Sequence, residues 1–386
     1  MFNFTTLPPL ALYIHFPWCV QKCPYCDFNS HALKNGIPEN DYINALIADL
    51  EQELPLIWGR SITSIFMGGG TPSLFSAESI DKLFSALRAR LAFSPNIEIT
   101  LEANPGTVEQ ARFKDYRAIG INRLSIGVQS FDDKKLTRLG RIHDSHEAIV
   151  AAETAHASGF DNFNLDLMFG LPNQTSREAL QDIQQAVSLS PAHISWYQLT
   201  IEPNTLFHHQ PPPLPNDDLL WEIYSQGQDE LDKAGYTQYE VSAYAKKNMQ
   251  CSHNLNYWQF GDYIGIGAGA HGKITHAANQ TIIRRHKIKQ PEAYLTHANT
   301  QQVLAGEQWL QPDDAKLEFM MNALRLNEGF PLSLFQQQTG LDTHTISENL
   351  QLAQSKGLLE INDAYVRPTQ QGRYFLNNLL ELFMPS

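Results

Sequence analysis

The chain has 386 residues, of which 42% are hydrophobic, so it is long enough for a large core and too apolar for a disordered protein. Lys and Arg number 28 against 41 Asp and Glu, and the net charge of −13 argues against a general attraction to nucleic acid or anionic lipid. No apolar run approaches the roughly 20 residues of a membrane span, and from the first residues we expect no signal peptide.

The first two-thirds of the chain alternate between short β-like runs and amphipathic helical stretches. The predicted strands cover residues 11–16, 61–67, 96–102, 123–129, 163–169 and 193–199. The predicted helices between them include residues 42–54, 77–91, 145–157 and 176–189. This rhythm predicts βαβ units and a parallel α/β sheet. Six units are too few for a closed eightfold barrel, so we expect a partial (β/α)6 barrel with ligands at the C-terminal ends of its strands.

The proline-rich segment at residues 210–218 interrupts this pattern and suggests a boundary. We expect three parts: residues 1–210, a middle extension at 211–310 with a helix over 219–234 and a strand over 237–245, and residues 311–386. The last part predicts three helices followed by a hairpin at 358–368, a mainly helical order that resembles a winged helix. Its presumed recognition helix carries a single lysine, Lys356, so we expect a packing or docking module and no nucleic-acid partner.

Three of the four cysteines lie just after the first predicted strand, spaced C-x3-C-x2-C as Cys19, Cys23 and Cys26. A tight, odd-numbered group indicates thiolates kept reduced for a metal, and hence a cytoplasmic protein. Three thiolates can surround an iron–sulfur cube and leave one iron open for chemistry. The alternative is a structural zinc site with His31 or Cys251 as the fourth ligand, although zinc motifs favour paired cysteines or histidines.

This cysteine spacing, with Tyr25 directly before the last cysteine, resembles that of the radical S-adenosylmethionine (SAM) superfamily. The resemblance implies a [4Fe–4S] cluster whose open iron chelates the amine and carboxylate of SAM. It also implies that an electron from the cluster cleaves the sulfonium to give a 5′-deoxyadenosyl radical, while the protein binds and shields the cofactor.

Glycine and polar residues stand at the ends of the later strands, where a ligand is expected. Glycines let the backbone approach a ligand closely, and an Asp in an apolar strand needs a polar partner. The residues at or near strand ends are Gly68, Gly69, Gly70, Thr71, Glu102 and Gln129, while Arg141 follows the fourth strand and Asp166 lies within the fifth. Over about residues 12–273 these segments resemble the branch around oxygen-independent coproporphyrinogen III oxidase. That resemblance implies that Tyr13, Tyr25 and the glycine motif line the SAM site and that Glu102 faces its methionine end. It further implies that Arg141 pairs with the SAM carboxylate, and that Gln129 and Asp166 bind the ribose.

Two departures separate the chain from that oxidase. Phe28 stands where the oxidase has a fourth cysteine, and the segment before the first strand is shorter. Downstream, the string HNLNYW supplies His253, Tyr257 and Trp258 and resembles the signature of a haem-chaperone family in the same superfamily. The resemblance implies haem as a third cofactor and places these residues near it.

The residues alone leave other interpretations open. Histidine is a common axial ligand of haem iron, but Tyr257 and Trp258 are equally compatible with a core, and His253 with a turn cap. Cys251 lacks the C-x-x-C-H context of covalent haem attachment, and GIGAGAHG at 265–272 predicts a tight turn near the ligand.

Three functions follow from these observations. We prefer a haem chaperone that passes haem to an unidentified acceptor protein, for which a membrane-bound respiratory enzyme is one candidate. Membrane association is then expected only through such a partner, and the chain is a monomer or a homodimer. The alternatives are oxidative decarboxylation of coproporphyrinogen III, which the two departures argue against, and a different radical enzyme or methyltransferase. No catalytic residue is assigned.

Overall fold

Six parallel strands form the centre of the sheet, in the predicted order. The computed structural model describes residues 1–34, 36–362 and 364–384. The strands are β1 (Leu10–Phe16), β4 (Ser61–Gly69), β5 (Ala92–Ala103), β6 (Arg123–Gln129), β7 (Phe163–Phe169) and β8 (His193–Gln198), each paired with the next. Most of their side chains are buried, as expected of parallel strands covered by helices. The predicted partial (β/α)6 barrel is confirmed.

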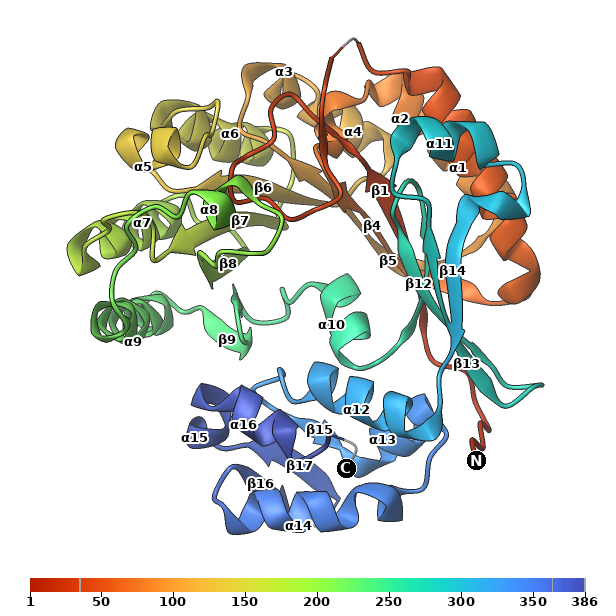
Figure 1. Cartoon of the computed structure of the whole chain (residues 1–386). Helices are drawn as coiled ribbons and strands as arrows, with labels where there is room; N and C mark the ends of the chain where they lie inside the picture. Colours follow the sequence, from red (N-terminus) through yellow and green to blue (C-terminus); the bar gives the residue numbers. More distant parts are fainter. Residues whose placement is uncertain (35, 363, 385–386) are drawn as a thin grey trace.

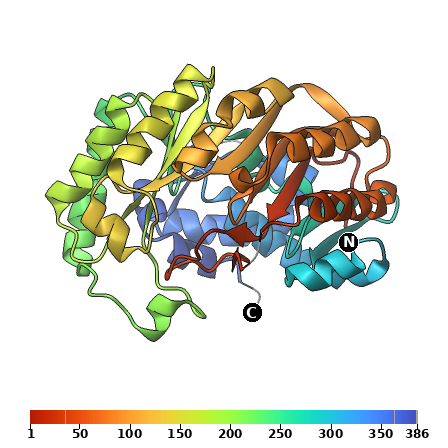
Figure 2. The ribbon, with the colours of Figure 1, turned by 90° about the horizontal axis from the view of Figure 1, so that it is seen from above.

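Helices cover the outer face of this curved sheet (Figures 1 and 2). The longer ones are α1 (Glu39–Glu53), α2 (Ala77–Arg90), α6 (Ser145–Ala157), α7 (Ser176–Ser188) and α9 (Asp217–Lys233). Shorter elements between the strands are η1 (Leu54–Leu56), η2 (Pro72–Leu74), α3 (Thr107–Gln110), α4 (Phe113–Ile119), α5 (Asp133–Arg138) and α8 (Leu206–His209). Capping boxes begin α6 at Asp144 and α7 at Thr175, because each cap side chain and the Glu three residues later satisfy free backbone N–H groups.

The middle segment extends the same sheet at both edges. Beside β1 lie β11 (Asp262–Ile266), β12 (His271–His276), β13 (Thr281–Lys287) and β14 (Leu304–Trp309), and α11 (Pro291–His297) and η3 (Gln301–Val303) connect the last two. Beside β8 lie β10 (Ala243–Ala245) and β9 (Thr237–Glu240). The single strand expected over 237–245 is wrong. The chain folds into a hairpin, and the Ser242 N–H donates to the Glu240 side chain at the bend over 3.0 Å. The boundary at residue 210 remains a prediction.

The C-terminal part lies below the open side of the sheet, with α10 (Ser252–Trp258) between them (Figure 1). Its elements are α12 (Pro312–Ala323), β15 (Phe330–Pro331), α13 (Leu332–Thr339), η4 (Thr343–Ile346), α14 (Ser347–Ser355), β16 (Leu359–Asn362), β17 (Tyr365–Pro368), α15 (Gln370–Tyr374) and α16 (Leu376–Glu381). The predicted helices and hairpin are present, and α15 and α16 are additional. Phe4, from the start of the chain, packs into the core of this part. Within the described residues, no helix is long and apolar enough to cross a membrane.

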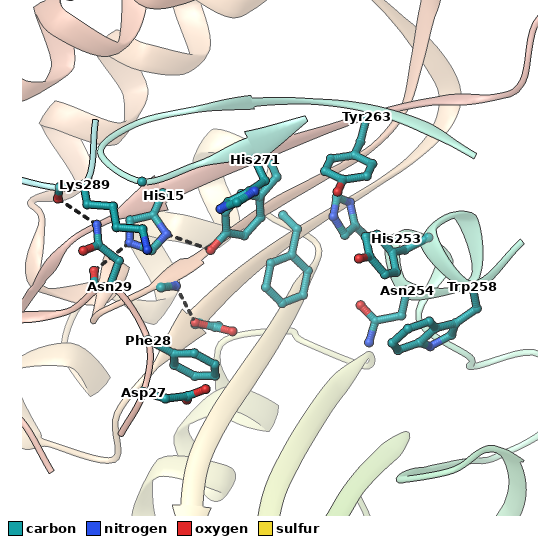
Figure 3. Close-up of a pocket in the computed structure, with 16 residues that line it drawn as sticks. His15, Asp27, Phe28, Asn29, His253, Asn254, Trp258, Tyr263, His271 and Lys289 are labelled. Atoms are coloured by element: carbon teal, nitrogen blue, oxygen red, sulfur yellow. Dashed lines mark hydrogen bonds between the residues drawn. The ribbon is translucent and has the colours of Figure 1, made fainter. Parts of the chain in front are cut away.

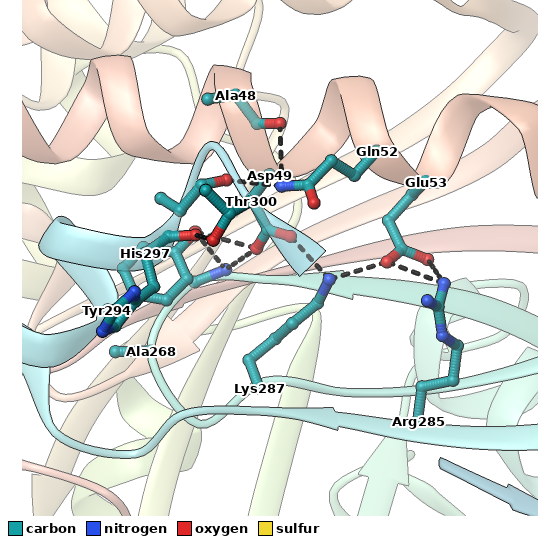
Figure 4. A network of polar contacts seen from close by, with 12 residues as sticks. Ala48, Asp49, Gln52, Glu53, Ala268, Arg285, Lys287, Tyr294, His297 and Thr300 are labelled. Carbon is teal, nitrogen blue, oxygen red and sulfur yellow. Dashed lines mark hydrogen bonds and ion pairs between the residues drawn. The ribbon is translucent and has the colours of Figure 1, made fainter. Parts of the chain in front are cut away.

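A buried network of charges ties α1 to β13 (Figure 4). The Lys287 ammonium donates to Asp49 over 2.5 Å and to Glu53 over 2.6 Å, and Arg285 donates to Glu53 over 2.9 Å. Asp49 also accepts from the backbone N–H of Gly267 over 3.1 Å. Buried charges are tolerated because each has several partners. The network therefore fixes the β11–β12 turn, which lines one of the cavities described below.

Candidate functional site

The three predicted ligand cysteines line a single cavity with a volume of about 490 Å³. They lie on the loop after β1, where β2 (Trp18–Cys19) pairs with β3 (His31–Ala32). Arg141 donates to the Cys23 sulfur over 3.7 Å, and the Cys26 sulfur lies 3.4 Å from the Ser30 hydroxyl. Burial raises the pKa of Cys19, and the two neighbouring thiols act in the same direction. We call this space the cofactor cavity.

The donor set fits an iron–sulfur cluster better than a single metal ion. Among the described residues, no three His, Cys, Asp or Glu side chains are close enough to hold one ion. A cluster needs only one thiolate per iron around its cube, so its ligands stand further apart. The two fourth ligands considered for zinc have other partners. The Cys251 thiol is buried and donates to Glu98 over 3.5 Å, and the His31 ring bonds Asn29 over 3.2 Å.

The glycine motif holds the cysteine loop against β4. Gly69 has φ +110°, and a Cβ there would lie 2.3 Å from the His15 ring. A Cβ on Gly70 would lie 2.5 Å from the Trp18 carbonyl oxygen. The Gly70 N–H donates to the Phe16 carbonyl over 2.7 Å, and the Thr71 N–H donates to that of Trp18 over 2.8 Å. A side chain at Gly69 would displace the His15 ring of β1, and one at Gly70 would push the loop backbone at Trp18 away from the sheet.

Two carboxylates line the cofactor cavity, one from β5 and one from β7, which flank β6 in the sheet. Glu102 accepts the Gly69 N–H over 3.0 Å, and burial together with the charge of Asp166 raises its pKa to about 8. Burial also raises the pKa of Asp166, which accepts from the Ser125 hydroxyl over 3.0 Å and from the Asn164 amide over 2.8 Å. Acids held in this way favour a polar or cationic ligand, because such a ligand would stabilise their charged form.

Gln129 and Arg141 complete the polar wall. Gln129 ends β6 with φ +70°, a strained conformation for a residue with a side chain, and accepts the Tyr197 hydroxyl over 2.9 Å. Arg141 donates to Asn104 over 2.8 Å and to the Gly127 carbonyl over 2.7 Å. Its guanidinium therefore lies fixed beside the Cys23 thiol. Tyr25 lines the same cavity with its ring 6.3 Å from that of Phe207.

A second cavity, of about 520 Å³, adjoins the first (Figure 3). Tyr13 lines this second cavity and not the cofactor cavity where it was expected. The reason lies in its register on β1, between Phe66 of β4 and Gly265 of β11. From there its hydroxyl reaches the Nδ1 atom of His15 over 3.0 Å.

His253 lies within this second cavity, on α10. Its Nδ1 atom is 3.0 Å from the Ser64 hydroxyl, and its ring is 5.2 Å from that of Phe66. Burial lowers its pKa to about 4, so the imidazole is neutral at physiological pH. Glu98 caps α10 by accepting the backbone N–H groups of Ser252 and His253, each over 3.0 Å. The His253 ring is therefore not needed as a turn cap.

Tyr257 and Trp258 also line the second cavity and are half-buried, so they are not core aromatics. The Tyr257 ring is 5.3 Å from that of Tyr263, and the Arg325 guanidinium lies 4.4 Å from the centre of the Trp258 ring. In Figure 3, His253 and Trp258 lie on one side of the space. Flat aromatic walls and a neutral histidine suit a planar, largely apolar ligand.

Comparisons with known proteins agree with this geometry. The radical SAM superfamily model matches residues 13–186, and the HemN C-terminal domain model matches residues 310–375. The heme chaperone HemW of Haemophilus influenzae is 54% identical over 382 residues, which is 98% of both chains. The chain belongs to the HemW family. The heme chaperone HemW of Bacillus subtilis is 34% identical over 97% of this chain and 99% of its own.

Among solved structures, coproporphyrinogen III oxidase (HemN) of Escherichia coli, a radical SAM enzyme, matches with a TM-score of 0.83. It covers 98% of this chain and 90% of its own at 24% identity, so the likeness shows a shared fold. The predicted family is thus confirmed, and the prediction that separated this chain from the oxidase agrees with its HemW relatives.

Several residues of the second cavity escaped the sequence analysis of this HemW-family chain. They are His15, Asn29, Tyr263, His271 and Lys289. The glycine-rich string offered one signal. It forms the predicted tight turn, with Gly267 at φ +106° and Gly269 at φ +79°, and carries His271 into the wall. His15 and Lys289 stand in segments with no recognisable motif.

The two cavities share one wall. Phe28, Gly69, Glu102, Asn254 and Trp258 line both of them. A ligand in either cavity would therefore contact the same side chains. This shared wall brings α10, which carries the HNLNYW string, next to the glycine motif after β4.

Proposed function

We propose that this chain is a haem chaperone. It holds a [4Fe–4S] cluster and SAM in the cofactor cavity, binds haem in the second cavity, and passes haem to an acceptor protein. The observation that carries the proposal is the shared wall, in which Gly69 and Glu102 of the SAM side meet Asn254 and Trp258 of the haem side. Occupancy of one cavity can therefore affect the other.

In the cofactor cavity, Cys19, Cys23 and Cys26 would hold three irons. The cluster, when bound, supplies the electron that cleaves the SAM sulfonium. Arg141 is already oriented by Asn104 and Gly127, so its fork can pair with a carboxylate. The glycine motif and Glu102 would bind the SAM amine, and Gln129 and Asp166 the ribose hydroxyls.

In the second cavity, His253 is the proposed axial ligand. A metal-binding histidine usually donates its other ring N–H to a neighbouring acceptor. The Ser64 hydroxyl, 3.0 Å from Nδ1, provides that acceptor and leaves Nε2 for iron. The low pKa keeps the ring neutral, as ligation requires. Tyr257 and Trp258 would pack against the macrocycle.

Titration of the cluster-loaded protein with haem tests the proposal. We expect a shifted Soret band and no conversion of coproporphyrinogen III under reducing, anaerobic conditions. Phe28→Cys should not create oxidase activity, because one added thiol in the shared wall does not rebuild a substrate site. Oxidase turnover by the unmodified protein would replace the chaperone proposal with the oxidase one.

The acceptor and the location of the chain are parts of the same proposal. We place the chain in the cytoplasm, with a membrane-bound respiratory enzyme as a candidate acceptor and membrane contact only through that partner. Haem-loaded protein mixed with membranes that contain a haem-free respiratory cytochrome should restore the cytochrome spectrum. A matched mixture with free haem at the same concentration controls for spontaneous insertion. Equal restoration by free haem would contradict a delivery role.

A further inference from the structure

A third cavity lies where the barrel meets the C-terminal part. Its volume is about 390 Å³. Its wall combines residues of β8, α9 and α15 with the β9–β10 bend, and aromatic side chains supply much of it. Its lining includes Trp196, Tyr197, Trp221, Tyr224, Arg373 and Tyr374.

The aromatic rings form a layered wall. The rings of Trp196 and Tyr224 are parallel within 6°, with centres 6.2 Å apart. The Trp221 ring lies 6.1 Å from that of Tyr224 and meets the Tyr374 ring edge-on at 4.7 Å. Trp196 is buried, but Trp221 is 50% exposed and Tyr374 is 37% exposed. Two large aromatic side chains thus leave apolar surface open at the mouth, where a flat ligand could cover it.

One cation stands in this wall. Among the residues that the structure describes, Arg373 forms no ion pair with an acid. Asp217, the one acidic side chain in the wall, is exposed at the start of α9. A guanidinium without an acidic partner beside stacked aromatic rings suits a carboxylate or phosphate attached to a planar ring system.

The third cavity adjoins the cofactor cavity. Tyr197 and Ser242 line both. The Tyr197 hydroxyl donates to Gln129, the strained residue at the end of β6. A ligand in the third cavity would therefore contact a side chain that orients one of the expected SAM contacts.

We infer that the third cavity binds a planar conjugated ring bearing an anionic group, with the ring against Trp221 and Tyr224 and the anion on Arg373. Two ligands share this chemistry: a porphyrin with its propionates and an adenine nucleotide with its phosphates. The porphyrin case rests on the proposed function and would make this cavity a second haem position. The nucleotide case is independent of haem.

Two variants of the full, cluster-loaded chain test the inference. Trp221→Ala removes the exposed ring, and Arg373→Gln removes the cation. Trp58→Ala and Arg177→Gln are matched controls, because Trp58 is 87% exposed, Arg177 is exposed, and neither lines the cavity. Haem and ATP are titrated separately into each protein, and stoichiometry and affinity are measured by calorimetry and absorbance. Circular dichroism confirms that each variant is folded.

With haem, we expect the unmodified chain to bind two equivalents, one of which weakens about ten- to a hundredfold in Trp221→Ala and Arg373→Gln but not in the controls. If ATP binds at a single site and its affinity falls in the same two variants, the cavity is a nucleotide site. Binding of both ligands that is unaffected by either variant would overturn the inference. If the chain binds one haem whose affinity depends on His253 alone, and binds no ATP, the inference about the third cavity is overturned and the proposed function stays intact. Absence of haem binding with ATP bound at Arg373 would instead overturn the proposed function alone.

Discussion

The cofactor cavity and the second cavity share a wall but differ in chemistry. Thiols, carboxylates and a fixed guanidinium line the cofactor cavity, and they come from a loop and the ends of adjacent parallel strands. Neutral histidines and aromatic rings line the second cavity, and they come from β1, β4, the cysteine loop, α10, β11 and β12. The first surface suits a charged, polar cofactor, whereas the second suits a flat apolar ligand with a metal at its centre.

This contrast separates the two binding functions by residue. A change in the cofactor cavity outside the shared wall should affect SAM or the cluster without altering haem, and a change at His253 or Tyr257 of α10 should do the reverse. Only residues of the shared wall should affect both. The following predictions test that separation.

The largest effect is expected for the cluster ligands. Cys19→Ala, Cys23→Ala and Cys26→Ala should each abolish the [4Fe–4S] cluster, because each thiolate is the protein ligand of a different iron. Iron and sulfide analysis with the visible spectrum after anaerobic reconstitution measures this. Cys251→Ala is the matched control and should keep about one cluster per chain. Loss of the cluster in that variant would contradict the assignment of three ligands.

The two cavities also differed in how well the sequence predicted them. In the cofactor cavity, Glu102, Gln129 and the glycine motif stand at the ends of parallel strands, and such ends meet at one edge of a sheet. Their convergence could therefore be expected from strand order alone. Asp166 lies in the middle of β7, where an acid in an apolar strand indicates a polar partner. Tyr13 lines the second cavity, between Phe66 of β4 and Gly265 of β11, and its role toward SAM stays a prediction.

The second cavity needs contacts between segments far apart in the chain. Asn29 meets the backbone of Ala268 and Lys289 through hydrogen bonds of 2.8 and 2.9 Å. The strand β13 carries charges, including Lys287, whose partners lie on α1. In the sequence, charged residues such as those of β13 indicate a solvent-exposed segment unless buried partners are known. The antiparallel strands at this edge of the sheet were therefore not predicted.

The next effect concerns haem. His253→Ala should change the Soret spectrum and weaken haem binding, because an iron–nitrogen bond is lost. SAM binding by the same variant should stay within about twofold, since His253 does not line the cofactor cavity. His208→Ala is the control, because His208 is exposed on α8. Weaker binding with an unchanged spectrum would mean that His253 contacts haem without ligating its iron.

A smaller effect is expected for SAM affinity. Arg141→Ala and Asp166→Ala should each weaken SAM binding about ten- to a hundredfold with the cluster intact, because a charge-assisted contact is worth roughly 1.5–3 kcal/mol. Equilibrium dialysis of the reconstituted protein measures the affinity, and the haem spectrum should not change. Arg177→Ala, on the outer surface, should bind SAM normally. Unchanged binding in both variants would remove these residues from the SAM site.

The smallest effect is the pH dependence of Glu102. Its pKa rises from 4.5 in the unfolded chain to about 8 in the fold, so between these values the folded state holds a proton that the unfolded state has released. This contribution to the free energy of unfolding therefore decreases as pH rises from about 4.5 through 8. Glu102→Gln should remove this loss of stability with rising pH, because the amide stays uncharged. The free energy of unfolding of the ligand-free variant should therefore exceed that of the unmodified protein by about 1–3 kcal/mol at pH 9, with little difference near pH 4.

For SAM binding, unlike for the stability of the ligand-free protein, ionisation of Glu102 should be favourable. The cationic groups of SAM favour the charged carboxylate, so SAM affinity of the unmodified protein should increase as pH rises through about 8. Glu102→Gln should lose this pH dependence and bind SAM more weakly at high pH. Because Glu102 also lines the second cavity, haem affinity should shift in this variant, whereas it should not in Asp166→Ala. Identical haem affinities in both would show that the shared wall does not connect the two ligands, and the separation of the cavities would then be complete.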